Sequence, residues 1–171
     1  MPPALPFDPI WEAGRQWRRR WGTAPVAPME AVTSIMRVQQ ILLARCNQAL
    51  EPFGLTFARY EALMLLSFAR EGSLPLGKVG ARLQVHPASV TNLIDGLEQL
   101  GYVRREPHPT DRRTTLAGIT AEGRRQAEAA TQAMHAIRFG IRALDTSELE
   151  QLTALLRRVR VAEGDFDADE K

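Results

Sequence analysis

The sequence contains little cysteine and little histidine. Its 171 residues include one cysteine, Cys46, and three histidines. A single cysteine excludes an intramolecular disulfide and a thiolate cluster for a metal ion. His86, His108 and His135 are far apart and lack the spacing of helical metal ligands. We therefore expect no metal site and no cofactor.

Signals for membranes and export are also missing. The longest uncharged run is far shorter than the roughly 18 apolar residues that a membrane span needs. The opening segment, MPPALPFDPIW, has no basic residues ahead of an apolar run, so we expect no secretory signal. Together these features predict a soluble cytoplasmic protein without a membrane partner.

Positive charge is concentrated in the body of the chain. The formal net charge is +2, but residues 163–171 carry five acids and one lysine. Residues 1–162 therefore hold 21 basic and 15 acidic residues. We predict that 163–171 form a solvated, disordered acidic tail and that the basic body suits an anionic partner.

Helical periodicity dominates the rest of the sequence, which predicts a mainly α fold. Apolar side chains spaced by three and four between Ala127 and Leu144 predict a coiled-coil-like seam on one long helix. Asp145 and Glu148 resemble a capping box that begins the last helix. The predicted helices before it span residues 29–52, 57–70, 76–83, 88–100 and 121–142.

Residues 76–100 have the proportions of a helix-turn-helix, and a β-hairpin follows them. In the second helix an apolar stripe leaves the other face small and polar. Ser89, Thr91 and Asn92 on that face could enter the major groove, where Asn bonds adenine and a Thr methyl contacts thymine. An ordinary amphipathic surface helix would show the same pattern.

The hairpin is rich in arginine. Residues 102–106 and 113–117 favour strands, and the turn between them is formed by Pro, His and Asp. An exposed arginine ribbon can follow a phosphate backbone or enter the minor groove. Asp111 is expected to brace one of the arginines beside it. A solvated charged loop is the alternative interpretation. The arginines are Arg104, Arg105, Arg112 and Arg113.

The run HPASVTNLIDGLEQLGYVRREPHPTDRRTTLAGITAEGR resembles the recognition helix and wing of the MarR family of bacterial transcriptional regulators. The PTDRR turn and the Thr-rich segment after it carry most of the resemblance. The resemblance implies a homodimeric repressor that binds a near-palindromic site on double-stranded DNA. It also implies release by a small-molecule effector that is often aromatic or acidic, and a cytoplasmic, nucleoid-associated location.

The resemblance also implies a domain plan and DNA-binding residues. Residues 55–119 would form the winged helix-turn-helix, flanked by dimerisation helices in 26–54 and 120–162. Ser89, Thr91 and Asn92 would contact bases, and Asp111 would brace the wing. The expected DNA-binding residues are Lys78, His86, Ser89, Thr91, Asn92, Arg105, Arg112 and Arg113.

Residues 1–25 extend beyond the common family core. Asp8 and Pro9 predict a helix that places tryptophans on one face and arginines on the others. This helix either docks on the dimer or forms a wall of an effector pocket, as in urate-responsive members of the family. The candidate effector residues are Trp17, Arg20, Trp21 and Glu61. Cys46, on an apolar helix face, is expected to be inert rather than a redox sensor.

Two other function classes compete with a DNA-binding regulator. A winged helix that binds protein instead of DNA would carry acidic or apolar residues on its exposed face, and Asp95 favours it slightly. An enzyme would need a nucleophile–base pair, a phosphate-binding glycine loop or a metal cluster. Because none of these motifs occurs in the sequence, we do not expect an enzyme.

Overall fold

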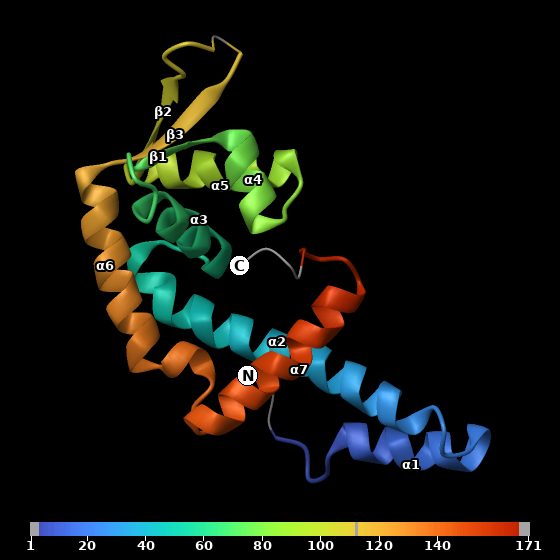
Figure 1. Cartoon of the computed structure of the whole chain (residues 1–171). Helices are drawn as coiled ribbons and strands as arrows, with labels where there is room; N and C mark the ends of the chain where they lie inside the picture. Colours follow the sequence, from blue (N-terminus) through green and yellow to red (C-terminus); the bar gives the residue numbers. More distant parts are fainter. Residues whose placement is uncertain (1–3, 112, 168–171) are drawn as a thin grey trace.

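The computed structural model describes residues 4–111 and 113–167. The winged helix lies at one end, and helices α2 and α7 lie at the other (Figure 1). The elements, in chain order, are α1 Pro9–Trp21, α2 Val26–Leu50, the 3-10 turn η1 Glu51–Phe53, α3 Phe57–Ser67, β1 Ser73–Pro75, α4 Leu76–Leu83, α5 Pro87–Gln99, β2 Val103–Pro107, β3 Thr115–Ile119, α6 Ala121–Ala136, the 3-10 turn η2 Arg138–Gly140 and α7 Thr146–Ala162.

Side-chain caps start the helices where the sequence predicted them. Asp8 accepts a hydrogen bond from the Ile10 amide, and Thr120 accepts one from the Gly123 amide. Asp145 and Glu148 form the predicted capping box at the start of α7. Each cap satisfies amides that have no partner within their own helix. The starts of these three helices therefore follow from local sequence.

The wing belongs to a three-stranded antiparallel sheet in the order β1-β3-β2. The predicted hairpin is present as β2 and β3, which pair from Val103 opposite Ile119 to Pro107 opposite Thr115. The sequence analysis missed β1, in which Leu74 pairs with Ala117. A strand of three residues is too short to show alternation, and only pairing across the fold defines it.

One buried core joins α3, α5 and α6. Leu63, Leu66, Ile94 and Leu97 are fully buried between α3 and the inner face of α5. Met134 of α6 is also fully buried in this core. Ala127 and Ala130 are buried in it as well, so these positions of the predicted coiled-coil seam pack within their own chain. The 3-4 spacing thus predicted the apolar face of α6, and the fold shows that this part of the face packs within its own chain, because the spacing does not name the partner.

The predicted long helix 121–142 is also interrupted. It ends at Ala136, and Arg138 and Phe139 of η2 adopt left-handed backbone angles with φ of 48° and 50°. The Arg45 guanidinium of α2 donates a 2.8 Å hydrogen bond to the Gly140 carbonyl. Left-handed angles are costly for residues other than glycine, so tertiary packing against α2 sustains this bend.

The acidic tail begins as an ordered turn, which corrects the prediction of disorder for its first residues. Gly164, with φ of 70°, ends α7 in a Schellman motif. The Gly164 amide donates a hydrogen bond to the Val161 carbonyl, and the Asp165 amide donates one to the Arg160 carbonyl. The turn directs Asp165 back toward the helix-turn-helix. There its carboxylate accepts hydrogen bonds from Arg160 at 2.6 Å and from Gln84 at 2.8 Å. The tail beyond Asp167 lies outside the described residues.

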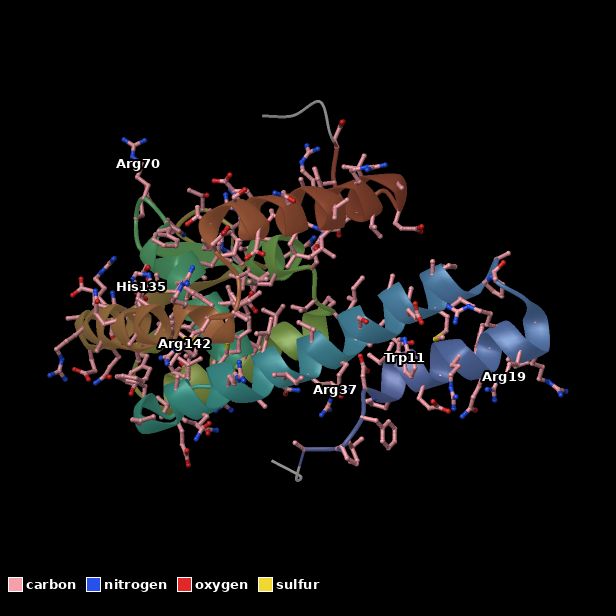
Figure 2. The ribbon with its side chains drawn as sticks, turned by 90° about the horizontal axis from the view of Figure 1, so that it is seen from below. Trp11, Arg19, Arg37, Arg70, His135 and Arg142 are labelled. Carbon is pink, nitrogen blue, oxygen red and sulfur yellow. The ribbon has the colours of Figure 1, made fainter. Side chains whose placement is uncertain are left out.

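The N-terminal extension forms the predicted helix α1, which runs alongside the first half of α2 (Figure 2). The two helices approach closely at Gly14. A β-carbon added to Gly14 would lie 1.8 Å from a Glu30 carboxylate oxygen of α2. α1 therefore packs on α2 of its own chain, while Trp11 and Trp21 stay 61% and 59% exposed. Docking of its tryptophans on the dimer stays a prediction.

We expect Met134→Ala to lower the free energy of unfolding by about 2–5 kcal/mol, because it opens a cavity in a closed core. Urea denaturation followed by circular dichroism measures this change. The control is Phe68→Ala, since Phe68 is 78% exposed and should change stability by about 0.5 kcal/mol or less. A stable Met134→Ala variant with an altered oligomeric mass would contradict the internal packing of Met134 and place it between subunits.

Candidate DNA-binding surface and effector groove

Helix α5 has the two faces that the sequence predicted. Val90 and Ile94 are buried against the core, whereas Ser89, Thr91 and Asn92 are exposed. The Thr91 hydroxyl donates a 3.3 Å hydrogen bond to the Pro87 carbonyl. The exposed side chains are small enough for a helix to approach base edges closely.

The start of α5 is built to receive an anion. His86 is the N-cap, and its Nδ1 accepts a hydrogen bond from the Ala88 amide at 3.2 Å. The ring can therefore donate from Nε2 into solvent. Pro87 occupies the first turn, where a missing amide costs nothing. The Ala88, Ser89 and Val90 amides of this turn already bond to His86, so the positive end of the helix dipole is what favours a phosphate here.

Lys78 adds a positive charge on the preceding helix. It lies exposed on α4, next to the buried Val79 that anchors this helix to the core. Within residues 4–111 and 113–167, Lys78 forms no ion pair. Its ammonium group is therefore available to a phosphate.

Arg105 is committed within the protein, contrary to the prediction that it binds DNA. Its guanidinium pairs with Asp95 at 2.5 Å and with Glu98, both on α5. Its backbone amide also donates to the Glu98 carboxylate at 3.1 Å. Two carboxylates satisfy the fork of the guanidinium, so Arg105 fastens the wing strand β2 to α5. Arg105 is seven residues from Glu98 and ten residues from Asp95 in the sequence, so no local pattern predicted these ion pairs.

Asp111 braces the turn of the wing rather than an arginine side chain. It accepts hydrogen bonds from the Thr114 hydroxyl at 2.6 Å and from the Arg113 amide at 3.0 Å. These bonds lower the pKa of the Asp111 carboxyl, with the Thr114 hydroxyl as the largest cause. The prediction that Asp111 binds an arginine side chain was therefore wrong, because Asp111 caps the turn instead. The Arg113 side chain is exposed and forms no ion pair with any residue that the structure describes. Arg112 lies outside the described residues.

His108 is a second brace, which the sequence analysis did not identify. Its Nδ1 accepts from the Asp111 amide at 3.2 Å and lies 3.3 Å from the Thr110 nitrogen. The order His-Pro-Thr-Asp could have predicted this brace, because a histidine ring nitrogen can accept a hydrogen bond from an amide two or three residues later. His86 caps α5 in the same way.

A groove of about 780 Å³ lies between α2, α3, η2 and α7. Glu61 lines it, but Trp17, Arg20 and Trp21 do not. Those three residues contact each other on α1, where the Trp17 and Trp21 rings are 4.9 Å apart and the Arg20 guanidinium is 5.6 Å from the Trp21 ring. Within this chain, Trp17, Arg20 and Trp21 of α1 therefore do not share the groove that Glu61 lines.

Two ionisable side chains line the groove. Packing around Glu61 raises the pKa of its carboxyl, although part of the side chain still reaches solvent. Cys46 is buried, and burial followed by the charge of Glu61 raises the pKa of its thiol. A raised pKa keeps the thiol protonated and unreactive.

None of the described helices combines the length and apolarity of a membrane span. Among the described residues, no three His, Cys, Asp or Glu side chains group as a metal site.

Comparisons with known proteins identify the family. A model of the MarR family matches residues 53–114. The crystal structure of Sco5413, a MarR family transcriptional regulator from Streptomyces coelicolor, is 52% identical; the match covers 83% of this chain and 99% of that one, with a TM-score of 0.77. The chain belongs to the MarR family.

Other similar proteins have lower sequence identity to this chain. The uncharacterised HTH-type regulator YhbI of Bacillus subtilis is 35% identical over 117 residues, which are 67% of this chain and 75% of YhbI. CouR from Rhodococcus jostii, solved with p-coumaroyl-CoA bound, is 30% identical with a TM-score of 0.63; the match covers 73% of this chain and 87% of CouR. This MarR-family chain is thus a DNA-binding transcriptional regulator of the winged-helix type.

The two wing arginines should differ in salt-dependent DNA binding. Arg113→Ala should lower affinity for most sequences and lower the slope of log affinity against log salt by about one unit per lost phosphate contact. Arg105→Ala should lower affinity by loosening the wing while changing the slope less. A fluorescence anisotropy titration at several salt concentrations measures both effects. Equal slope changes in the two variants would contradict the internal role of Arg105.

Proposed function

We propose that this MarR-family regulator is a homodimeric repressor that binds a near-palindromic operator and is released by a small organic effector. The observation that carries the proposal is the exposed polar face of α5 beside the free Arg113 and Lys78. Ser89, Thr91 and Asn92 on this face are proposed to contact base edges. The basic residues are proposed to contact phosphates, which position the helix in the groove.

Exposed apolar side chains support the homodimer. Val32, Met36, Leu155 and Val159 are each 54–60% exposed, and they lie on α2 and α7. No residue of α7 is buried within the chain. An amphipathic helix of 17 residues without a buried position needs a partner to stabilise its apolar stripe. A second copy supplies the same two helices.

A twofold dimer explains the operator and the mode of repression. Two recognition helices related by a twofold axis contact two inverted half-sites, about one helical turn of DNA or a multiple apart. A dimer on such a site covers the DNA that a polymerase must reach, which favours repression. This activity takes place on the chromosome, so we propose a nucleoid-associated location in the cytoplasm.

The groove beside Glu61 is the proposed effector site. Its volume is that of a site for a drug-sized molecule, and its lining is mostly apolar. The bound p-coumaroyl-CoA of CouR shows that a relative takes an aromatic ligand. We therefore retain the aromatic part of the expected effector. The acidic part is opposed by the carboxylate of Glu61.

The competing protein-binding module receives less support. Asp95, the residue that favoured it, pairs with Arg105 and is not a free acid. The exposed face that remains is polar and basic, which suits DNA better than a protein partner.

Asn92→Ala should cost roughly 1–3 kcal/mol per half-site on the preferred operator and little on scrambled DNA, because a base contact carries most of its energy on the matching sequence. Binding titrations on both DNAs measure this difference. Ser147→Ala, far along the chain on α7, serves as the control. A loss of equal size on scrambled DNA would show that Asn92 does not contact a base.

Val159→Asp should convert the dimer to a monomer, because it places a charge in an apolar interface. Thr153→Asp adds the same charge to an exposed polar position on another side of α7 and should leave the dimer intact. Sedimentation equilibrium gives the mass of each variant. A dimeric Val159→Asp protein would remove α7 from the proposed interface.

A further inference from the structure

The groove beside Glu61 is enclosed by four elements of a single chain. Leu42 and Cys46 come from α2, Phe57 from α3, Phe139 from η2 and Leu156 from α7. Val32, Met36, Leu155 and Val159, the side chains assigned to the dimer, do not line the groove. Other exposed apolar residues of α2 and α7 do line it, so the groove borders the face proposed for the second copy. They are Ile35, Val38, Leu43 and Leu156.

The charge on the walls of the groove is negative and comes from Glu61. Among its lining residues, Glu61 and Cys46 are the ionisable groups, and the protonated thiol of Cys46 is neutral. Within the described residues, Glu61 is in no ion pair. Glu61 is exposed to solvent beside the apolar lining of the groove, where its carboxylate attracts a cation and repels an anion. An acidic effector would meet no positive side chain on these walls.

We infer that this groove binds hydrophobic cations: molecules with an aromatic or aliphatic body and one positive charge placed against the Glu61 carboxylate. The inference deepens the proposed function, on which its regulatory meaning rests, by naming the chemical class of the effector. The site itself requires the groove and Glu61 alone.

The neighbours of Glu61 suit such a ligand. Phe57 precedes Glu61 by four residues on α3, so the ring and the carboxylate share one helix face. Phe139 lines the groove from η2. Aromatic faces attract organic cations, which adds to the attraction of the carboxylate. Partial desolvation raises the pKa of the Glu61 carboxyl although the residue is exposed, and a bound cation would stabilise its charged form.

The position of Phe139 links the groove to the DNA-binding end. η2 follows α6 directly, and α6 begins immediately after wing strand β3 (Figure 1). A ligand that displaces Phe139 would act on a backbone bend already held in left-handed angles. A change in that bend would move α6 and, with it, the wing.

The test uses two ions of nearly the same shape and opposite charge, tetraphenylphosphonium and tetraphenylborate. Isothermal titration of the full-length protein measures the affinity for each. We expect the phosphonium to bind at least about tenfold more tightly. E61Q should abolish this preference, because it removes the charge and keeps the shape. E128Q, at an exposed position of α6, should retain it.

Three outcomes would overturn the inference. They are equal affinities for the two ions, a preference that survives E61Q, and no binding of either ion, which would mean that the groove is closed or filled by the second copy. Operator binding is measured separately in the same samples. Normal operator binding without phosphonium binding would refute the cation site and leave the repressor proposal standing. Phosphonium binding that leaves operator affinity unchanged would support the site and refute the proposed release by an effector.

Discussion

The packing of α5 on α3 is the contact on which the rest of the molecule depends. Leu63, Leu66, Ile94 and Leu97 are fully buried between these helices. The approach is close at Gly96, where an added β-carbon would lie 2.4 Å from the Arg59 guanidinium. Because burial fixes the rotation of α5 about its axis, it determines which residues face solvent. The exposed row of Ser89, Thr91 and Asn92 is a consequence of this core.

The wing is positioned by charges that act within the protein. Arg105 pairs with Asp95 and Glu98 and so links strand β2 to helix α5. Asp111 and His108 hold the turn at the wing tip. With these groups committed, Arg113 and Lys78 remain for an outside anion. Arg105 and Arg113 therefore differ in their environment, because Arg105 pairs with two carboxylates and Arg113 is exposed.

The apolar residues of the outer helices divide in a similar way. Those of α6 enter the core of their own chain, whereas those of α7 stay exposed and favour a second copy. Between the two helices, η2 forms a wall of the groove that Glu61 lines. The proposed effector site thus lies where the internal core ends and the proposed dimer contact begins.

Features set by neighbours within a few residues could be predicted from the sequence. The caps at Asp8, Thr120 and Asp145, the two faces of α5 and the β2–β3 hairpin all depend on contacts of short range. Such contacts have the same geometry in most folds, so residue type and spacing define them. The proposed DNA-contacting face of α5 could be predicted for this reason.

Tertiary structure alone decided the features that join distant segments. β1 is a strand because Leu74 pairs with Ala117, and η2 bends where Arg45 bonds the Gly140 carbonyl. Arg105 faces inward, and Asp165 turns back to Gln84, for the same reason. A sequence gives the chemistry of each side chain but not its partner, because the partner is selected when the whole core packs. The sequence by itself therefore determined the helices, their caps and a basic winged helix, whereas the fold decided which charges and apolar faces remain free to bind.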